Sequence, residues 1–132
     1  MINEKLFHEK YVHFDKETVV EIIDIFINEY QERIDRISRS LDMRSLENLQ
    51  KNAHASRAVI GNFDMDTRAF HEISSIEDQT RLLLQEIKEG RKLSRNEDEE
   101  FFSKIEKTFG DFKRDSRSLI SQLKELRKHY AT

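Results

Sequence analysis

Apolar residues recur every three or four positions along most of this chain, and that spacing predicts helices rather than strands. The segment from Ile2 to about Val12 predicts a short helix, which must lie across other helices to be stable. Asp15 is the predicted N-cap of a long helix that follows. The apolar face of this long helix is expected to hold Val19, Ile22, Ile23, Phe26, Ile27, Tyr30, Ile34, Ile37 and Leu41.

A third helix is predicted between a turn at residues 42–45 and the pair Gly61 and Asn62, with Ser45 as its N-cap. Its buried face follows steps of three and four residues: Leu46, Leu49, Ala53, Ser56, Ile60 and Phe63. His54 lies beside this face rather than on it, so its ring is expected to point toward solvent. Its neighbours on that side are polar, cationic or small: Gln50, Arg57, Ala58 and Gly61. A histidine placed in this way is available to a partner protein.

Two further helices complete the chain. Asp64 or Asp66 is the predicted N-cap of the first, which is expected to stop near Gly90. Polar residues 90–98 connect it to a last helix over about residues 97–129. The buried positions are expected to be Phe70, Ile73, Ile76, Leu83, Leu84 and Ile87 in the first of these helices, and Phe102, Ile105, Phe109, Phe112, Ile120, Leu123 and Leu126 in the second.

Composition supports this interpretation. A chain of 132 residues with no Pro, three Gly and 37% charged residues is typical of one all-helical domain, here residues 1–132. The connections are too short for a crossover, so we expect an all-α, antiparallel up-down-up-down four-helix bundle with a short extra N-terminal helix. The starting Met1 and the charged end of the chain favour a freestanding protein over a piece of a larger one.

Several function classes are disfavoured. The net charge of −3 is spread over every segment, so nucleic acid is not an expected ligand. No apolar run approaches the roughly 20 residues of a membrane span, and the absence of Cys fits a reducing compartment. We therefore expect a cytoplasmic monomer that does not bind a membrane. None of the five histidines follows a Glu three residues earlier, so no metal site and no cofactor are expected in this chain.

Residues 53–63 resemble the motif of the histidine phosphotransfer (HPt) domain, the relay module of multistep two-component signalling. That motif has Ala-His, a variable residue, an apolar residue, Lys, Gly, a few small residues and commonly Asn, an apolar residue and Gly. The matching residues here are Ala53, His54, Arg57, Gly61, Asn62 and Phe63. The long preceding helix with Phe26 to Tyr30 and the pair Ile76 and Glu77 are also similar to the family, so the resemblance covers nearly the whole chain.

This sequence departs from the motif at four positions. Arg57 replaces the usual Lys, which keeps the positive charge and adds a planar group suited to phosphate oxygens. Ala58 replaces Gly and adds a methyl group on the expected docking face. Ser56 stands where an apolar residue is usual, and Asp64 stands in place of the closing Gly. None of these changes removes the histidine.

The resemblance implies that a phosphoryl group passes from a phosphoaspartate of one receiver domain to His54, and then to an aspartate of another. Phosphorylation adds about two negative charges, and Arg57, one helical turn after His54, is the candidate to offset them. In the family, a residue on the following helix orients the ring by accepting a hydrogen bond. Glu77 holds this position if one residue is inserted near Thr67 or Arg68, and Ile76 holds it otherwise.

The expected partners are response-regulator receiver domains and a hybrid sensor histidine kinase. Receivers are expected to dock on a face that includes Gln50, His54, Ala58 and Gly61. The receiver supplies Mg²⁺ in such relays, so the resemblance implies a phosphoryl carrier rather than an enzyme. Two alternatives remain: a helical adaptor that docks a receiver or kinase without carrying phosphate, and an oligomerisation domain in which His54 has no role.

Overall fold

The computed structural model describes all residues from 1 to 132 and is all-helical. Helices take up 81% of the chain, and no strand is present. The prediction of an all-α fold is therefore confirmed. The helices are α1 (Glu4–Lys10), α2 (Lys16–Asp42), α3 (Leu46–Gly61), α4 (Arg68–Lys88) and α5 (Arg95–Tyr130).

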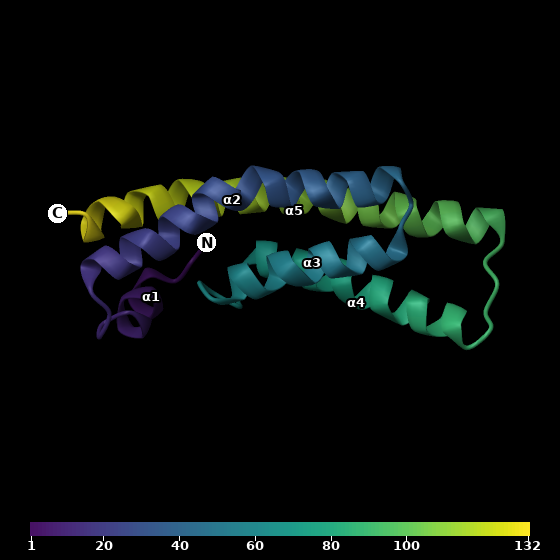
Figure 1. Cartoon of the computed structure of the whole chain (residues 1–132), viewed down its shortest axis with the longest axis horizontal. Coiled ribbons are helices and arrows are strands. Elements are labelled where there is room, and N and C mark those ends of the chain that lie inside the picture. The colour runs from purple at the N-terminus through teal and green to yellow at the C-terminus, as the bar shows by residue number, and fades with distance from the viewer.

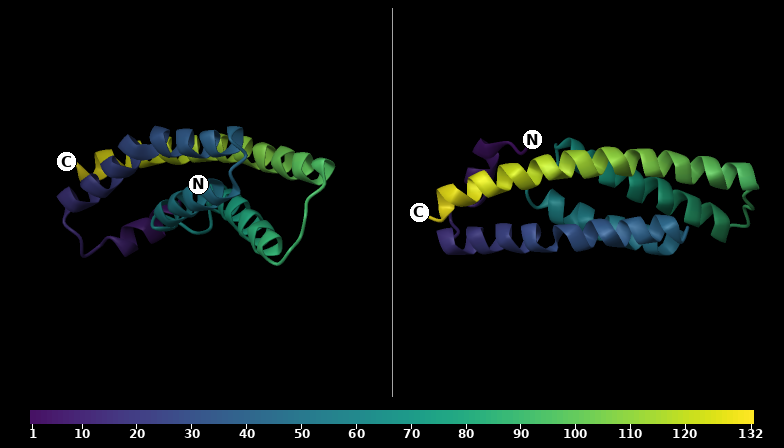
Figure 2. Two further views of the ribbon diagram at one scale, coloured as in Figure 1. Left: turned by 45° about the vertical axis from the view of Figure 1, so that its right-hand side comes forward. Right: turned by 90° about the horizontal axis from the view of Figure 1, so that it is seen from above.

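The four longer helices contact one another in a closed order, since α2 and α4 each pack against both α3 and α5. Figure 1 shows α2 and α5 running side by side. The pair α3 and α4 lies below them in this view, with α3 packed against α2 and α4 packed against α5. The short α1 lies near the start of α2 (Figures 1 and 2). The last turns of α4 and the first turns of α5 project past the connection between α2 and α3, so they have fewer neighbours than the rest of the molecule.

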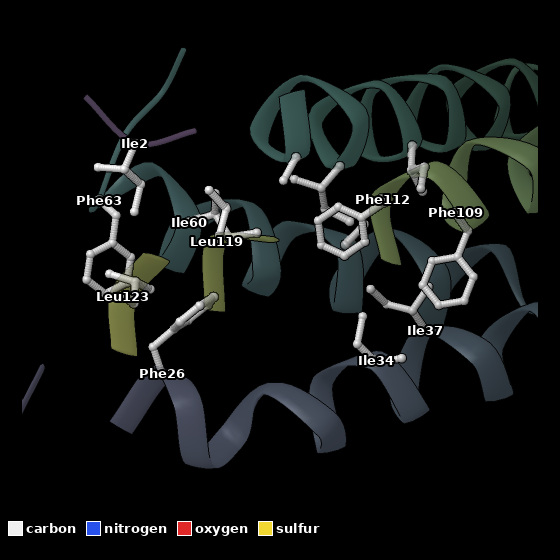
Figure 3. Packing of buried hydrophobic residues seen from close by; sticks show 14 of the residues in the cluster. Ile2, Phe26, Ile34, Ile37, Ile60, Phe63, Phe109, Phe112, Leu119 and Leu123 are labelled. Carbon is white, nitrogen blue, oxygen red and sulfur yellow. The ribbon is translucent and has the colours of Figure 1, made fainter. Parts of the chain in front are cut away.

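One apolar core runs between the helices. In Figure 3, side chains of α2, α3 and α5 meet, with Phe26 and Phe63 at one end of the group. Their ring centroids are 5.2 Å apart, which is a favourable distance for an edge-to-face aromatic pair. Most of the predicted apolar positions are buried. Several others, Ile120 among them, are only partly buried, and Leu119, which was not predicted, is buried. The prediction for Ile87 was wrong: it is 37% exposed because it lies in the projecting part of α4.

The helix starts were predicted in part. Ser45 caps α3 by accepting a hydrogen bond from the Asn48 backbone N–H, as expected. Asp15 precedes α2 but makes no side-chain capping bond. The N-terminal helix is also shorter than predicted, covering Glu4–Lys10 only.

The N-cap of α4 is Thr67, and neither Asp64 nor Asp66 takes that role. The Thr67 hydroxyl accepts from the backbone N–H of Phe70, 3.1 Å away. The Asp64 carboxylate instead accepts from the backbone N–H groups of Asn3 and Asp66. Thr67 is 2% exposed, so the structure places this cap against the core, where a hydroxyl on a short branched side chain fits.

The last helix begins at Arg95, two residues before the predicted start at Glu97. The Ser94 hydroxyl accepts from the Glu97 backbone N–H, and the Glu97 carboxylate accepts from the Ser94 backbone N–H, which completes a capping box. This arrangement includes residues 95–98 in the helix, although their polar character predicted a connection. Gly90, with φ of +105°, closes the preceding helix in a conformation that favours glycine.

The N-terminal segment is fastened to the bundle by hydrogen bonds over long sequence distances. The Ile2 backbone N–H donates to Gln122 Oε1 at 2.7 Å, and Gln122 Nε2 donates to the Ile2 carbonyl at 2.8 Å. Both groups are buried. His8 and the hydroxyl of Tyr130, which share a hydrogen bond of 2.6 Å, join α1 to the end of α5.

No stretch of any helix combines the length and hydropathy that a membrane crossing requires.

Candidate functional site

The buried face of α3 determines where His54 points. Leu49 and Ala53 are fully buried, and Ser56 and Ile60 follow them into the core. Because His54 is one position after Ala53, it lies at the edge of this face, and its side chain is 69% exposed. The sequence therefore predicted the outward placement of this ring correctly.

Glu77 reaches the same ring from α4. Its Oε2 lies 2.6 Å from His54 Nδ1, while the carboxylate itself is 7% exposed. An ionised carboxylate only accepts hydrogen bonds, so this contact assigns the proton of a neutral ring to Nδ1. The lone pair of Nε2 is then free. Ile76, the alternative candidate for this position, is fully buried in the apolar core.

Arg57 binds the other side of the same carboxylate. Its Nη1 donates to Glu77 Oε1 at 3.1 Å and to Asp78 Oδ1 at 3.3 Å. Both oxygens of Glu77 are therefore hydrogen-bonded, by His54 on one side and by Arg57 on the other. A buried carboxylate needs such partners, because an unpaired charge away from water is costly. The sequence placed Arg57 one turn after His54 but did not indicate that it pairs with carboxylates.

Phe70 lies beneath this arrangement. The Arg57 guanidinium carbon is 5.6 Å from the centroid of its ring. A Cβ atom on Gly61 would lie 3.0 Å from Phe70 Cε2, which is tighter than an ordinary contact. Gly61 thus allows the ring to pack closely against α3. Asn62 is the C-cap residue of α3, so Gly61 is the last residue of the helix and not its cap.

A depression of about 500 Å³ opens beside His54, between α3 and α4. Three of the residues predicted to form the site line this depression: Gln50, His54 and Glu77. Arg57 and Gly61 are not part of its lining, and Ala58 is exposed elsewhere on α3. The remaining lining residues are Glu47, Lys51 and Arg81.

Four charged residues at this site were missed in the sequence: Glu47, Lys51, Asp78 and Arg81. Lys51 lies three residues before His54, and Arg81 lies four residues after Glu77, so both share a helix face with a residue of the site. Asp78 is the second partner of Arg57. Helical spacing around His54 alone would have identified Lys51. Arg81 and Asp78 depend on the register between α3 and α4.

The other histidines are not part of this site. His13 and His71 are exposed, and His8 and His129 lie near the C-terminal end of α5 with ring centroids 5.1 Å apart. Across the 132 residues, the His, Asp and Glu side chains form no group of three that could hold a metal ion.

The arrangement at His54 presents one ring nitrogen to solvent and holds the other against a buried carboxylate. Such a ring can act as a nucleophile through the free nitrogen. Comparisons with protein-family models, with curated proteins and with solved structures find no match for this chain. The geometry at His54 and the motif around it are therefore the basis for a functional proposal.

Proposed function

We propose that this chain is a histidine phosphotransfer protein, in which His54 accepts a phosphoryl group from one receiver-domain aspartate and passes it to another. The observation that carries the proposal is the 2.6 Å contact between His54 Nδ1 and Glu77 Oε2, together with the 69% exposure of the ring. In a neutral ring, this contact leaves the lone pair of Nε2 free to react. The motif formed by Ala53, His54 and Arg57 supports the same function.

The proposed step balances without a cofactor in this chain. The lone pair of His54 Nε2 attacks the phosphorus of an aspartyl phosphate, the bond between that phosphorus and the carboxyl oxygen breaks, and the aspartate carboxylate leaves. The ring keeps its proton on Nδ1 and gains a positive charge, which the Glu77 carboxylate stabilises at hydrogen-bond distance. Glu77 thus both orients the ring and favours the charge that develops on it.

Under this proposal the chain is a carrier and not an enzyme, because the transfer chemistry depends on the receiver and its Mg²⁺. A hybrid sensor histidine kinase and response-regulator receivers are the proposed partners. Gln50 and Ala58 belong to the proposed docking face, since one lies beside His54 in the depression and the other is exposed on α3. Gly61 contributes to this face by letting Phe70 pack closely.

The proposal includes an antiparallel up-down-up-down four-helix bundle, formed by α2 to α5 with α1 as an addition, and a cytoplasmic monomer. The contacts of α2 and α4 with both α3 and α5 support this topology. Such a scaffold holds α3 between two neighbours, so the position of His54 is fixed on a rigid element.

Incubation with a phosphorylated receiver domain tests the proposal. We expect an acid-labile, alkali-stable label on the wild-type chain and none on His54→Gln. Binding of the receiver without label on either protein would instead support an adaptor. A native mass measurement that shows an obligate dimer with its interface over His54 would support an oligomerisation domain.

A further inference from the structure

We infer that Lys51 and Arg81 bind the phosphoryl group on His54, and that Arg57 is a positioning residue acting through Glu77. This inference rests on the proposed function and specifies which cations serve that site. Arg57 was the candidate expected from the sequence. The depression beside His54 indicates a different division of roles among the three cations.

The contacts of Arg57 lie on the side of the ring that does not react. Its Nη1 binds Glu77 Oε1 and Asp78 Oδ1, and Glu77 in turn binds His54 Nδ1. The guanidinium also lies over the Phe70 ring. If Arg57 turned toward a phosphoryl group, it would leave the Glu77 carboxylate, which is 7% exposed, with one partner fewer. Arg57 is therefore committed to holding Glu77.

Lys51 and Arg81 instead line the depression that contains the exposed ring. Lys51 is one turn before His54 on α3, so the two side chains are neighbours on the helix surface. Its ammonium group makes no ion pair in the structure. Arg81 reaches the depression from α4 and has only one long contact, 3.5 Å from Asp78 Oδ1. Both cations are free to bind phosphoryl oxygens from opposite walls.

Besides Glu77, which is bound to His54 and Arg57, Glu47 is the remaining carboxylate that lines this depression. Its carboxylate would repel a phosphoryl group, whereas Lys51 and Arg81 would attract it. The inference therefore predicts effects of opposite sign when these charges are removed, and opposite signs distinguish a local charge effect from a loss of folding.

The test uses potassium phosphoramidate as a small phosphodonor, so that no partner protein contributes charges. His54 Nε2 forms a bond to phosphorus, the phosphorus–nitrogen bond of the donor breaks, and ammonia leaves. A ³¹P NMR titration then gives the pH midpoint of the last ionisation of the bound phosphoryl group. Nearby cations lower this midpoint because they favour the dianion.

We expect Lys51→Gln and Arg81→Gln each to raise the midpoint by about half a pH unit, and Glu47→Gln to lower it. Lys104→Gln, an exposed change of equal charge on α5, is expected to leave it unchanged. Arg57→Gln is expected to alter the ¹⁵N signals of the unphosphorylated His54 ring, which Lys51→Gln leaves as they are. This second measurement separates positioning from phosphoryl binding.

A midpoint that stays constant in both Lys51→Gln and Arg81→Gln, but rises in Arg57→Gln, would overturn the inference and assign the phosphoryl group to Arg57. Failure of phosphoramidate and of a phosphorylated receiver to modify the wild-type His54 would overturn the proposed function itself. The two failures are therefore distinguishable.

Discussion

The His54 ring is held at one nitrogen and open at the other. Glu77 supplies the holding contact, and its carboxylate is buried enough to be fixed by its surroundings. Arg57 binds the second oxygen, so the carboxylate cannot rotate without losing a charged hydrogen bond. Orientation of the imidazole thus depends on two other side chains, Glu77 of α4 and Arg57 of α3.

Glu77→Ala tests this dependence. Without the acceptor, the proton of neutral His54 is expected to distribute over both ring nitrogens, which long-range ¹H–¹⁵N NMR detects. The rate of phosphorylation is expected to fall by about 10-fold to 100-fold, since a hydrogen bond to a charged group contributes roughly 1.5–3 kcal/mol. Asp78→Ala is the matched control, because Asp78 contacts Arg57 but not the ring. An unchanged proton position in Glu77→Ala would contradict the role of Glu77.

The sequence was informative about some of these residues. The spacing of Leu49, Ala53 and Ser56 predicted that His54 points outward, because a helix fixes the angle between successive side chains. The sequence did not decide whether Ile76 or Glu77 faces the His54 ring. A shift of one residue in the connection before α4 changes the direction of every side chain on that helix by about 100°. The contact of Arg57 with Glu77 depends on the same register.

At the scale of elements, α4 connects the site to the core. Thr67 caps its start. In its middle, Ile76 is buried in the core and the next residue, Glu77, contacts His54. Its end projects beyond α3. The cap at Thr67 therefore contributes to the register on which the site depends.

Thr67→Ala is expected to lower the free energy of unfolding by about 1 kcal/mol, because it removes the acceptor for the Phe70 N–H. Asp66→Ala is expected to have little effect. Urea denaturation measures both, and Thr67→Ser, which keeps the hydroxyl, serves as the control. Equal losses in Thr67→Ala and Asp66→Ala would mean that the N-terminus of α4 is not capped by Thr67.

A pair of carboxyl groups joins α4 to α5. Burial and the adjacent Asp115, with a smaller effect of Asp111, raise the pKa of Glu72 to about 8. In the structure, Glu72 Oε1 is enclosed without a hydrogen-bond partner. When Glu72 is protonated, it donates to Asp115, and this bond together with Arg114 lowers the pKa of Asp115. The pair therefore holds one proton over a wide pH range.

The raised pKa of Glu72 predicts that stability is lost as pH rises. The folded chain binds this proton more tightly than the unfolded chain, so the stabilising contribution is full below 4.5 and disappears as pH passes about 8. Urea denaturation across this window measures the loss. In Glu72→Gln, whose amide donates to Asp115 at every pH, the loss is expected to vanish. The same pH dependence in both proteins would contradict the shared proton.

At the scale of the whole molecule, hydrogen bonds between distant segments close the fold. Gln122 pairs with both backbone groups of Ile2, and Asp64 accepts from the Asn3 N–H. The first residues are thereby attached both to α5 and to the connection between α3 and α4. This arrangement brings the beginning of the chain against the bundle.

Gln122→Leu is expected to lower the free energy of unfolding by about 2 kcal/mol, because the N–H and carbonyl of Ile2 lose their partners in a buried place. Amide hydrogen exchange of residues 2–7 should become faster than in the wild type. Gln31→Leu, on the exposed surface of α2, provides the control. If the exchange of the N-terminal residues did not change, Gln122 would not hold this segment.

The periodicity of apolar residues predicted the order of the helices, because each needs one apolar face. The exposure of Ile87 could not be predicted, since it depends on how far α4 projects past α3. The burial of Gln122 was also missed, because a polar residue at a core position satisfies its hydrogen bonds with a segment distant in the sequence.

The most direct test of the central claim is to identify the nitrogen of His54 that carries the phosphoryl group. After phosphorylation by a receiver domain, ³¹P and ¹⁵N NMR distinguish the two ring isomers. The account predicts that the phosphoryl group is on Nε2 of His54, with the proton kept on Nδ1 beside Glu77, and that His54→Gln carries none. A phosphoryl group on Nδ1, or label that persists in His54→Gln, would contradict it.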